Sequence, residues 1–155
     1  MPEDTGRNAE KKMKVMVSAC DLGENCKYNG GNNYSERLMA FLKEQGINEK
    51  DIIPVCPEVL GGLSIPRYPC EICDGKVVNS NGEDVDKEFR LGAQLGLKLA
   101  VKENVELVIL QSRSPSCGVG LIYDGTFSGS KISGNGVFAQ LLIDNGIEVV
   151  DVACL

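Results

Sequence analysis

The sequence predicts an α/β fold, a single three-layer domain with a mostly parallel sheet and helices on both faces. Four short apolar runs rich in β-branched residues alternate with amphipathic helical patterns. These runs are almost continuously apolar, as is typical of parallel strands that are covered on both faces. The chain has 155 residues, 43% of them hydrophobic, so it is long enough to bury one substantial core.

The predicted strands share a short, apolar, β-branched character. They are Lys14–Ala19, Asp51–Val55, Val105–Leu110 and Ile147–Val152. Pro54 has no N–H to donate to a ladder, so it belongs near the end of its strand. Because parallel strands need crossover connections, we expect a helix in each long interval, with right-handed crossovers.

The first predicted helix begins at Ser35, whose hydroxyl is a suitable N-cap, and ends at Gly46. Leu38, Phe41 and Leu42 share its inward face.

A longer helix is predicted from Asp84, as its N-cap, to about Asn104. Gly92 and Gly96 lower its helix propensity, and we expect them to allow close approach to the sheet. A third helix is predicted at Val137–Asn145.

Two further segments have simpler predictions. Asn81-Gly82 predicts a tight turn in a small hairpin around Lys76–Asn79. Residues 1–12 are polar and mixed in charge, without the apolar segment of a secretory signal, so we expect a disordered tail at 1–12 and the α/β domain at 13–155.

Composition excludes several classes of function. A net charge of −6 argues against binding to nucleic-acid phosphates. No apolar stretch is long enough to span a membrane. The chain has no His, which excludes Ser-His-Asp and Cys-His catalysis. Its seven Cys are an odd number, so a disulfide framework fits poorly and we expect a reducing, cytoplasmic location. The oligomeric state stays open.

Three of the cysteines follow predicted strands. Cys20, Cys56 and Cys117 each lie where an apolar run gives way to a loop. Carboxyl ends of parallel strands meet at one edge of the sheet, so these thiols are expected to converge there. Three single thiols favour an iron–sulfur cluster with one open iron over the paired knuckles of structural zinc, although zinc and simple buried cysteines stay open as alternatives.

Polar groups accompany these thiols. Glu58 stands two residues beyond Cys56 and is either a general base beside a metal or a solvated loop carboxylate. Residues 112–118 place hydroxyls and one cation around Cys117, although a plain turn has a similar composition. Residues 124–129 form a Gly-rich loop whose N–H groups suit an anion. Cys70 and Cys73 form a lone CxxC, a weak signal for a redox pair or half a metal site.

Several segments, in this order, resemble a known family. They are Val17–Cys20, Gly23–Cys26, Tyr28–Gly31, Cys56–Leu63, Pro66-Arg67, Ser112–Gly118 and Ile122–Gly129. The family is the one catalogued as domain of unknown function five-two-three, whose members are recognised as thiouracil desulfidases, which are iron–sulfur enzymes. The resemblance covers about Lys14 to Val152.

The resemblance implies a 4Fe–4S cluster held by three cysteines, with the fourth iron free to take the sulfur of the substrate. Matched onto this chain, the ligands are Cys20, Cys56 and Cys117, and the catalytic carboxylate and hydroxyl are Glu58 and Ser114. Cys26 also lies in a family motif and is kept as a reserve ligand.

This sequence departs from the family pattern in two places. Asp21 stands where relatives usually have an apolar residue, and Cys70 and Cys73 stand where they usually have no cysteine.

The resulting hypothesis is non-redox hydrolytic removal of sulfur from a small thiolated nucleobase, a 2-thiouracil-like pyrimidine. Glu58 is expected to take a proton from water, and Ser114 to hold substrate or water in place. Two alternatives remain. One is a metal-binding or sulfur-trafficking protein without turnover, its metal completed by Cys26. The other is a thiol redox protein that uses Cys70 and Cys73.

Overall fold

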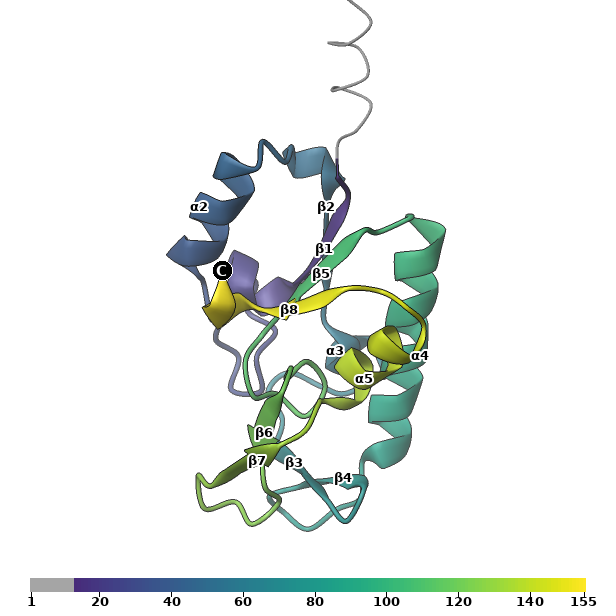
Figure 1. Ribbon diagram of the computed structural model, residues 1–155. Coiled ribbons are helices and arrows are strands. Elements are labelled where there is room, and N and C mark those ends of the chain that lie inside the picture. The colour runs from purple at the N-terminus through teal and green to yellow at the C-terminus, as the bar shows by residue number, and fades with distance from the viewer. Residues whose placement is uncertain (1–12) are drawn as a thin grey trace, which may run out of the picture.

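A four-stranded parallel sheet organises the fold (Figure 1). The computed structural model describes residues 13–155. The strand order is β2-β1-β5-β8, and each neighbouring pair is parallel. The strands are β1 (Val15–Ser18), β2 (Ile52–Val55), β5 (Leu107–Leu110) and β8 (Val149–Asp151). The α/β fold and all four predicted strands are confirmed, each strand being somewhat shorter than expected. The tail predicted at 1–12 lies outside the described residues.

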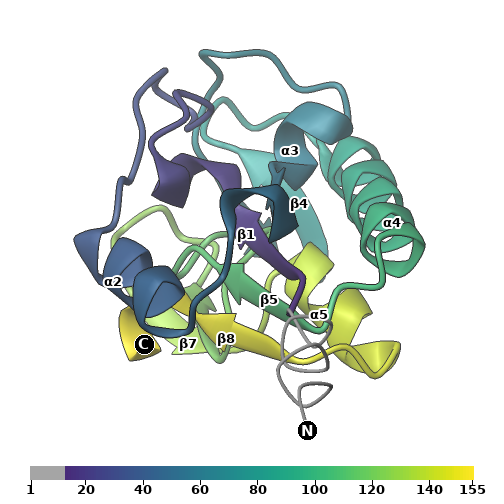
Figure 2. The ribbon, with the colours of Figure 1, turned by 90° about the horizontal axis from the view of Figure 1, so that it is seen from above.

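Helices cover both faces of this sheet. Viewed from above, α2 (Glu36–Glu44) lies on one side, and α4 (Asp86–Lys102) and α5 (Val137–Asp144) lie on the other (Figure 2). Ser35 is the N-cap of α2, as predicted, because its hydroxyl accepts the N–H of Leu38 at 3.1 Å.

The N-terminus of α4 differs from the prediction. Val85 is its N-cap residue, not Asp84. The Asp84 carboxylate still accepts the N–H of Asp86 at 2.9 Å, because a short acidic side chain can bond the backbone two residues on.

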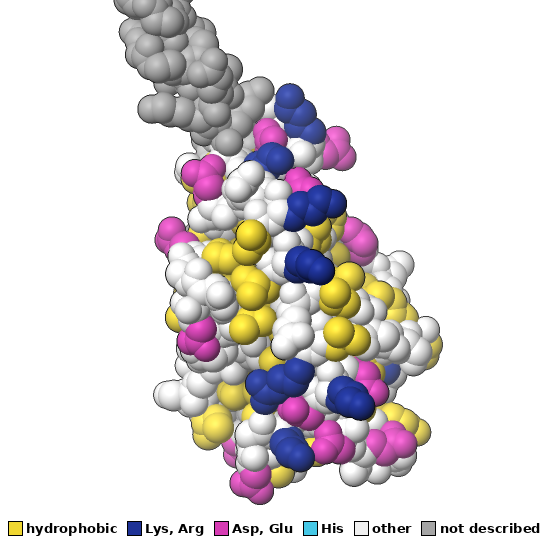
Figure 3. Space-filling model, turned by 90° about the vertical axis from the view of Figure 1, so that its right-hand side faces the viewer, with side chains coloured by type: hydrophobic (Ala, Val, Ile, Leu, Met, Phe, Trp, Pro, Cys, Tyr) yellow, Lys and Arg dark blue, Asp and Glu magenta, His cyan; other side chains and the backbone are white. Residues whose placement is uncertain are grey.

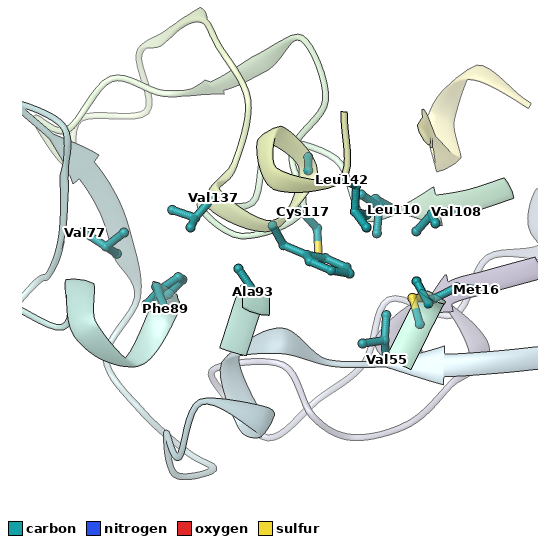
Figure 4. Packing of buried hydrophobic residues seen from close by; sticks show 13 residues of the cluster. Met16, Val55, Val77, Phe89, Ala93, Val108, Leu110, Cys117, Val137 and Leu142 are labelled. Atoms are coloured by element: carbon teal, nitrogen blue, oxygen red, sulfur yellow. The ribbon is translucent and has the colours of Figure 1, made fainter. Parts of the chain in front are cut away.

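The hydrophobic core has one cluster on each face. The cluster against α2 contains Val15, Val17 and Ile109 from the sheet, packed on Leu38 and Leu42. The larger cluster lies between the sheet and α4 and α5 (Figure 4). Its buried members are Met16, Val55, Val77, Phe89, Ala93, Ala100, Val108, Leu110, Cys117, Val137, Phe138, Ala139 and Leu142. The two clusters fix the sheet from both sides, as a three-layer fold requires.

Two antiparallel hairpins lie beyond one end of the sheet (Figure 1). One pairs β3 (Cys70–Cys73) with β4 (Lys76–Asn79), and the other pairs β6 (Leu121–Tyr123) with β7 (Lys131–Ser133). The sequence predicted only the β4 segment. The expected turn at Asn81-Gly82 is present after β4, where the N–H of Gly82 donates to the carbonyl of Asn79 at 2.9 Å.

Two glycines bring the short helix α3 (Pro57–Leu60) against the backbone of α4. A Cβ added at Gly92 would lie 1.8 Å from the carbonyl oxygen of Pro57, and one added at Gly61 would lie 2.0 Å from that of Glu88. A Cβ added at Gly96 would likewise lie 2.6 Å from a ring carbon of Phe138, in α5. The expectation that Gly92 and Gly96 approach the sheet is therefore wrong, because Gly92 packs against α3 and Gly96 packs against α5.

The face of the molecule that includes α4 carries hydrophobic side chains in its middle part, with charged ones mainly above and below them in this view (Figure 3). Leu91, Leu95 and Val101 are exposed there. Scattered apolar residues of this kind are ordinary on protein surfaces. Of the helices in residues 13–155, none combines the length and apolar character needed to cross a bilayer.

Gly92→Ala tests the α3–α4 contact. Alanine stabilises an isolated helix by about 1 kcal/mol relative to glycine, so propensity alone predicts a gain. We expect a loss of about 1–3 kcal/mol instead, because the new methyl group must displace the backbone of α3. Urea denaturation measures the free energy of unfolding, with Gln94→Ala, exposed on the same helix, as the control. A more stable Gly92→Ala protein would contradict the contact.

Candidate active site

A cavity of about 490 Å³ lies at the carboxyl ends of the parallel strands. Its lining includes Ser18 at the end of β1, Val55 at the end of β2 and Gln111 directly after β5. The chain leaves β1 toward β2 on one side and later returns to β5 on the other side of β1. Such a reversal of strand order is where open α/β sheets bind their ligands.

The three thiols predicted to converge all line this cavity. Cys20 lies in a 3-10 turn, Ala19–Leu22, that follows β1 directly. Cys56 is the N-cap residue of α3, between β2 and that helix. Cys117 lies in the loop after β5. The strand-end rule therefore placed each of them at the correct edge of the sheet.

Burial keeps two of these thiols, Cys20 and Cys117, in their neutral form. It raises the pKa of Cys20 to about 11, although a hydrogen bond from the Asn33 amide, 3.5 Å from the sulfur, acts in the opposite direction. Burial also raises the pKa of Cys117, whose sulfur lies 3.6 Å from the Ser116 hydroxyl. A metal that binds here must therefore displace protons from the thiols.

Cys117 contacts both the hydrophobic core and the cavity. It is 4% exposed and belongs to the larger hydrophobic cluster, where Figure 4 shows it among Leu110, Leu142 and Val137. The same residue lines the cavity. It therefore lies where the hydrophobic core meets the cavity, and not on the far side of the sheet.

The thiols surround a space and do not meet at a point. Within residues 13–155, no three Cys, Asp or Glu side chains gather closely enough to hold a single metal ion. The donors that the cavity does offer are soft sulfurs from three separate loops, the ligand type that iron–sulfur clusters use.

Glu58 is held from two directions in the cavity wall. Its Oε1 accepts a hydrogen bond from Nε of Arg67 at 3.0 Å and forms an ion pair with Nη2 of the same side chain at 2.9 Å, and its Oε2 accepts from the Ser116 hydroxyl at 2.9 Å. The Arg67 side chain is only 8% exposed, and it also donates to the carbonyls of Cys26 and Ser64. The carboxylate is therefore a fixed group of the site, which contradicts the alternative of a solvated loop residue.

Ser114 also lines the cavity, within a tight turn. Its hydroxyl oxygen accepts the N–H groups of Ser116 and Cys117 at 3.1 and 3.0 Å, and lies 2.9 Å from the Ser116 hydroxyl. The turn docks on the start of α5, where the N–H of Phe138 donates to the carbonyl of Ser116 at 2.9 Å. The N-terminus of α5, whose first three residues are buried, therefore fixes the turn that carries the Ser114 hydroxyl.

The remaining cysteines do not behave as one group. Cys26 is buried and lines the cavity, and burial raises its pKa to about 12. Cys70 also lines the cavity, whereas Cys73 is exposed. The two stand three residues apart on β3, and successive side chains of a strand point to opposite faces. The CxxC therefore separates its two thiols, contrary to what a redox pair needs.

The Gly-rich loop at 124–129 does not offer its N–H groups to an external anion. The Oε1 of Glu71 accepts from Gly125 and Phe127 at 3.0 and 3.1 Å. The Asp124 carboxylate accepts the N–H of Thr126 at 2.9 Å. The Glu71 carboxylate thus occupies the predicted anion site and connects the loop to β3.

Asp21, which departs from the family pattern, is fully buried behind Cys20. Neither of its carboxylate oxygens has a hydrogen-bond partner within the described residues. Burial, with a smaller contribution from Asp151, raises its pKa to about 7. Its carboxyl group therefore takes up a proton far more readily than an ordinary aspartic acid.

Sequence reasoning assigned no role to Arg67 or Ser116. Both stand in segments that carry the family resemblance, which was the only available signal. Their partners are distant in the chain: Ser116 lies 58 residues from Glu58, and Arg67 lies 41 residues from Cys26. Only the folded arrangement reveals these contacts.

Comparisons with known proteins bear on the family of this chain. A family model described as 2-thiouracil desulfurase matches residues 15–153. The uncharacterized protein YbbK of Bacillus subtilis (strain 168) is 42% identical over 146 residues, covering 88% of this chain and 93% of that protein. A solved structure of a [4Fe-4S]-dependent thiouracil desulfidase, TudS, superposes with a TM-score of 0.84 at 38% identity, covering 93% of each chain.

The match to the family model spans nearly all of the described chain, and the fold of TudS extends over the same length. This confirms the resemblance drawn from the sequence motifs. The chain belongs to the 2-thiouracil desulfurase family.

Proposed function

We propose that this protein removes sulfur from a thiolated pyrimidine by non-redox hydrolysis, with a 4Fe–4S cluster held by Cys20, Cys56 and Cys117. The observation that carries the proposal is the single cavity that these thiols share with Glu58 and Ser114. Its volume, about 490 Å³, is in the range of small-molecule pockets. Membership of a desulfurase family and the name of the structural neighbour support the activity and the cofactor.

The donor set fits such a cluster. Three thiols come from three loops, and a hydrogen-bond donor, the Asn33 amide, lies 3.5 Å from the sulfur of Cys20. Hydrogen bonds to ligand sulfurs are a usual means of tuning iron–sulfur sites. When bound, the cluster supplies a Lewis-acidic iron with an open position for the sulfur of the substrate.

The residues of the chain supply the hydrolytic half of the reaction. Glu58 takes a proton from water, whose oxygen adds to the ring carbon that bears the sulfur. Ser114 holds water or substrate in the approach that this addition needs. The carbon–sulfur bond then breaks, leaving a carbonyl on the ring, and the sulfur departs as hydrogen sulfide. One thiocarbonyl and one water thus give one carbonyl and one hydrogen sulfide, and no electrons are transferred.

A protein that binds metal without turnover is the second candidate. The observation that favours it is Cys26, buried in the same cavity, with its carbonyl 3.9 Å from the sulfur of Cys56. A fourth thiolate from Cys26 would close the open position on which the hydrolytic proposal depends. Anaerobic purification, an absorption spectrum and iron and sulfide counts, followed by an assay with 2-thiouracil, separate the two candidates. The cytoplasmic location expected from the sequence stays a prediction.

Glu58→Gln separates catalysis from cluster binding. The glutamine keeps the shape of the side chain but lacks the basic oxygen. We expect the cluster absorption to persist while turnover of 2-thiouracil falls by ~10²-fold or more, the usual scale for loss of a general base. Cys117→Ser should lose cluster and activity together, since a serine hydroxyl is a poor ligand for iron.

Glu106→Gln, exposed at the opposite end of the sheet, is the matched control and should retain both properties. Normal turnover by the Glu58→Gln protein would contradict the role of Glu58 as base. Loss of its cluster to the same extent as in the Cys117→Ser protein would instead make Glu58 a ligand.

Cys70→Ser and Cys73→Ser test whether the CxxC holds metal. Their side chains lie on opposite faces of β3, so we expect neither variant to change the iron content of anaerobically purified protein. Iron and sulfide analysis of both variants, and of the double variant, measures this. A loss of iron confined to Cys70→Ser would show that the thiol inside the cavity is a ligand.

A further inference from the structure

The Ser116 hydroxyl lies between the two side chains predicted to be catalytic. It is 2.9 Å from Oε2 of Glu58 and 2.9 Å from the hydroxyl of Ser114. Within residues 13–155, no hydrogen bond joins Ser114 to Glu58 directly. Ser116 is therefore the link between them, and it is only 2% exposed, so water does not compete for these bonds.

Counting protons fixes the direction of this chain of hydrogen bonds. An ionised carboxylate only accepts, so the single hydroxyl proton of Ser116 is donated to Glu58. The Ser114 oxygen already accepts two backbone N–H groups, from Ser116 and Cys117. Its own proton is therefore left to donate, and the Ser116 oxygen is the acceptor. The bonds run from Ser114 through Ser116 to Glu58.

One competing acceptor lies near Ser116. The Cys117 sulfur is 3.6 Å from its hydroxyl. A hydrogen bond to a charged oxygen at 2.9 Å is much stronger than one to a sulfur at this distance. The carboxylate therefore determines where the Ser116 proton points.

Both ends of this series of hydrogen bonds are held in place by further contacts. Arg67 holds Oε1 of Glu58 with one hydrogen bond, from Nε at 3.0 Å, and with an ion pair at 2.9 Å, so the carboxylate cannot turn away from Ser116 without losing both contacts. The carbonyl of Ser116 accepts the N–H groups of Phe138 and Ala139 at 2.9 and 3.1 Å, at the start of α5. A Cβ at Gly136 would lie 2.4 Å from the carbonyl carbon of Ser116, so the backbone here is closely packed.

We propose that Ser116 is a positioning residue for the desulfuration reaction, acting through Glu58 and Ser114. Its proton fixes Oε2 of Glu58, and its oxygen fixes the direction of the Ser114 hydroxyl. Without it, the carboxylate loses one of its donors and the Ser114 hydroxyl turns freely. This inference rests on the proposed function of the cavity, because it assigns Ser116 to the same reaction.

Ser116→Ala and Ser116→Thr test the proposal with 2-thiouracil. We expect the alanine variant to lower kcat about tenfold, the scale of one hydrogen bond to a charged group, with KM within about twofold of the unaltered protein. The threonine variant keeps the hydroxyl and should retain most of kcat. If Ser116 acted only through packing, the threonine variant would have the lower kcat, because its extra methyl group disturbs a buried site more than the loss of a hydroxyl does.

Two further measurements separate positioning from structure. Iron content and cluster absorption should be unchanged in Ser116→Ala, so that its lower kcat is not loss of cofactor. In a Glu58→Gln background the charged acceptor is gone, so adding Ser116→Ala should lower kcat by no more than about twofold. Where Glu58→Gln turnover is too slow to measure, the comparison of alanine with threonine decides alone. Ser133→Ala, exposed on β7, is the matched control.

The outcomes distinguish this inference from the proposed function. Absence of turnover in the unaltered protein overturns the proposed function and, with it, any role of Ser116 in that reaction. Normal turnover with an unchanged kcat in Ser116→Ala, a threonine variant worse than alanine, or cluster loss that matches the activity loss overturns the positioning role alone.

Discussion

The buried ion pair between Arg67 and Glu58 is the constraint on which the site depends. A cation that is 8% exposed needs its partner, because removing one member of a buried pair typically costs about 3–5 kcal/mol. The remaining donors of Arg67 bond the carbonyls of Cys26 and Ser64, and Glu58 bonds Ser116. One ion pair therefore joins the loops that follow β1, β2 and β5, the same three loops that carry the thiols.

The sheet determines which loops can be joined in this way. In the order β2-β1-β5-β8, the three strands followed by Cys20, Cys56 and Cys117 are adjacent, and their carboxyl ends share one edge. The close approach of Gly61 and Gly92 then places α3, with Glu58 in its first turn, directly against α4. The segment that carries Glu58 is thus packed closely against a long helix, which suits a site that must hold its reactants in a fixed position.

The strands of the sheet and the residues at their ends could be predicted from the sequence, but the side-chain contacts between the loops that follow them could not. Cys20, Cys56 and Cys117 were found because strand termini follow from apolar periodicity and topology. The β6–β7 hairpin was missed because each strand is only three residues long, and β7 is exposed throughout. The anion cradle at 124–129 was misread because its internal partner, Glu71, lies more than 50 residues away. Pairings of this kind depend on tertiary packing, which a local pattern does not contain.

The absence of histidine explains why the site needs so many supporting groups. Imidazole is neutral when it acts as a base, but this chain has no His, so in the proposed mechanism the role of base falls to a carboxylate whose charge is buried. A buried charge requires a counter-charge and hydrogen-bond donors, and Arg67 and Ser116 provide them at 2.9 Å. The neighbouring thiols Cys20 and Cys117 are kept neutral by burial, so they add no competing charge before metal binds. In the proposed mechanism, the ion pair, the hydrogen bonds of Ser116 and the neutral thiols are thus linked consequences of placing a carboxylate base beside a metal centre.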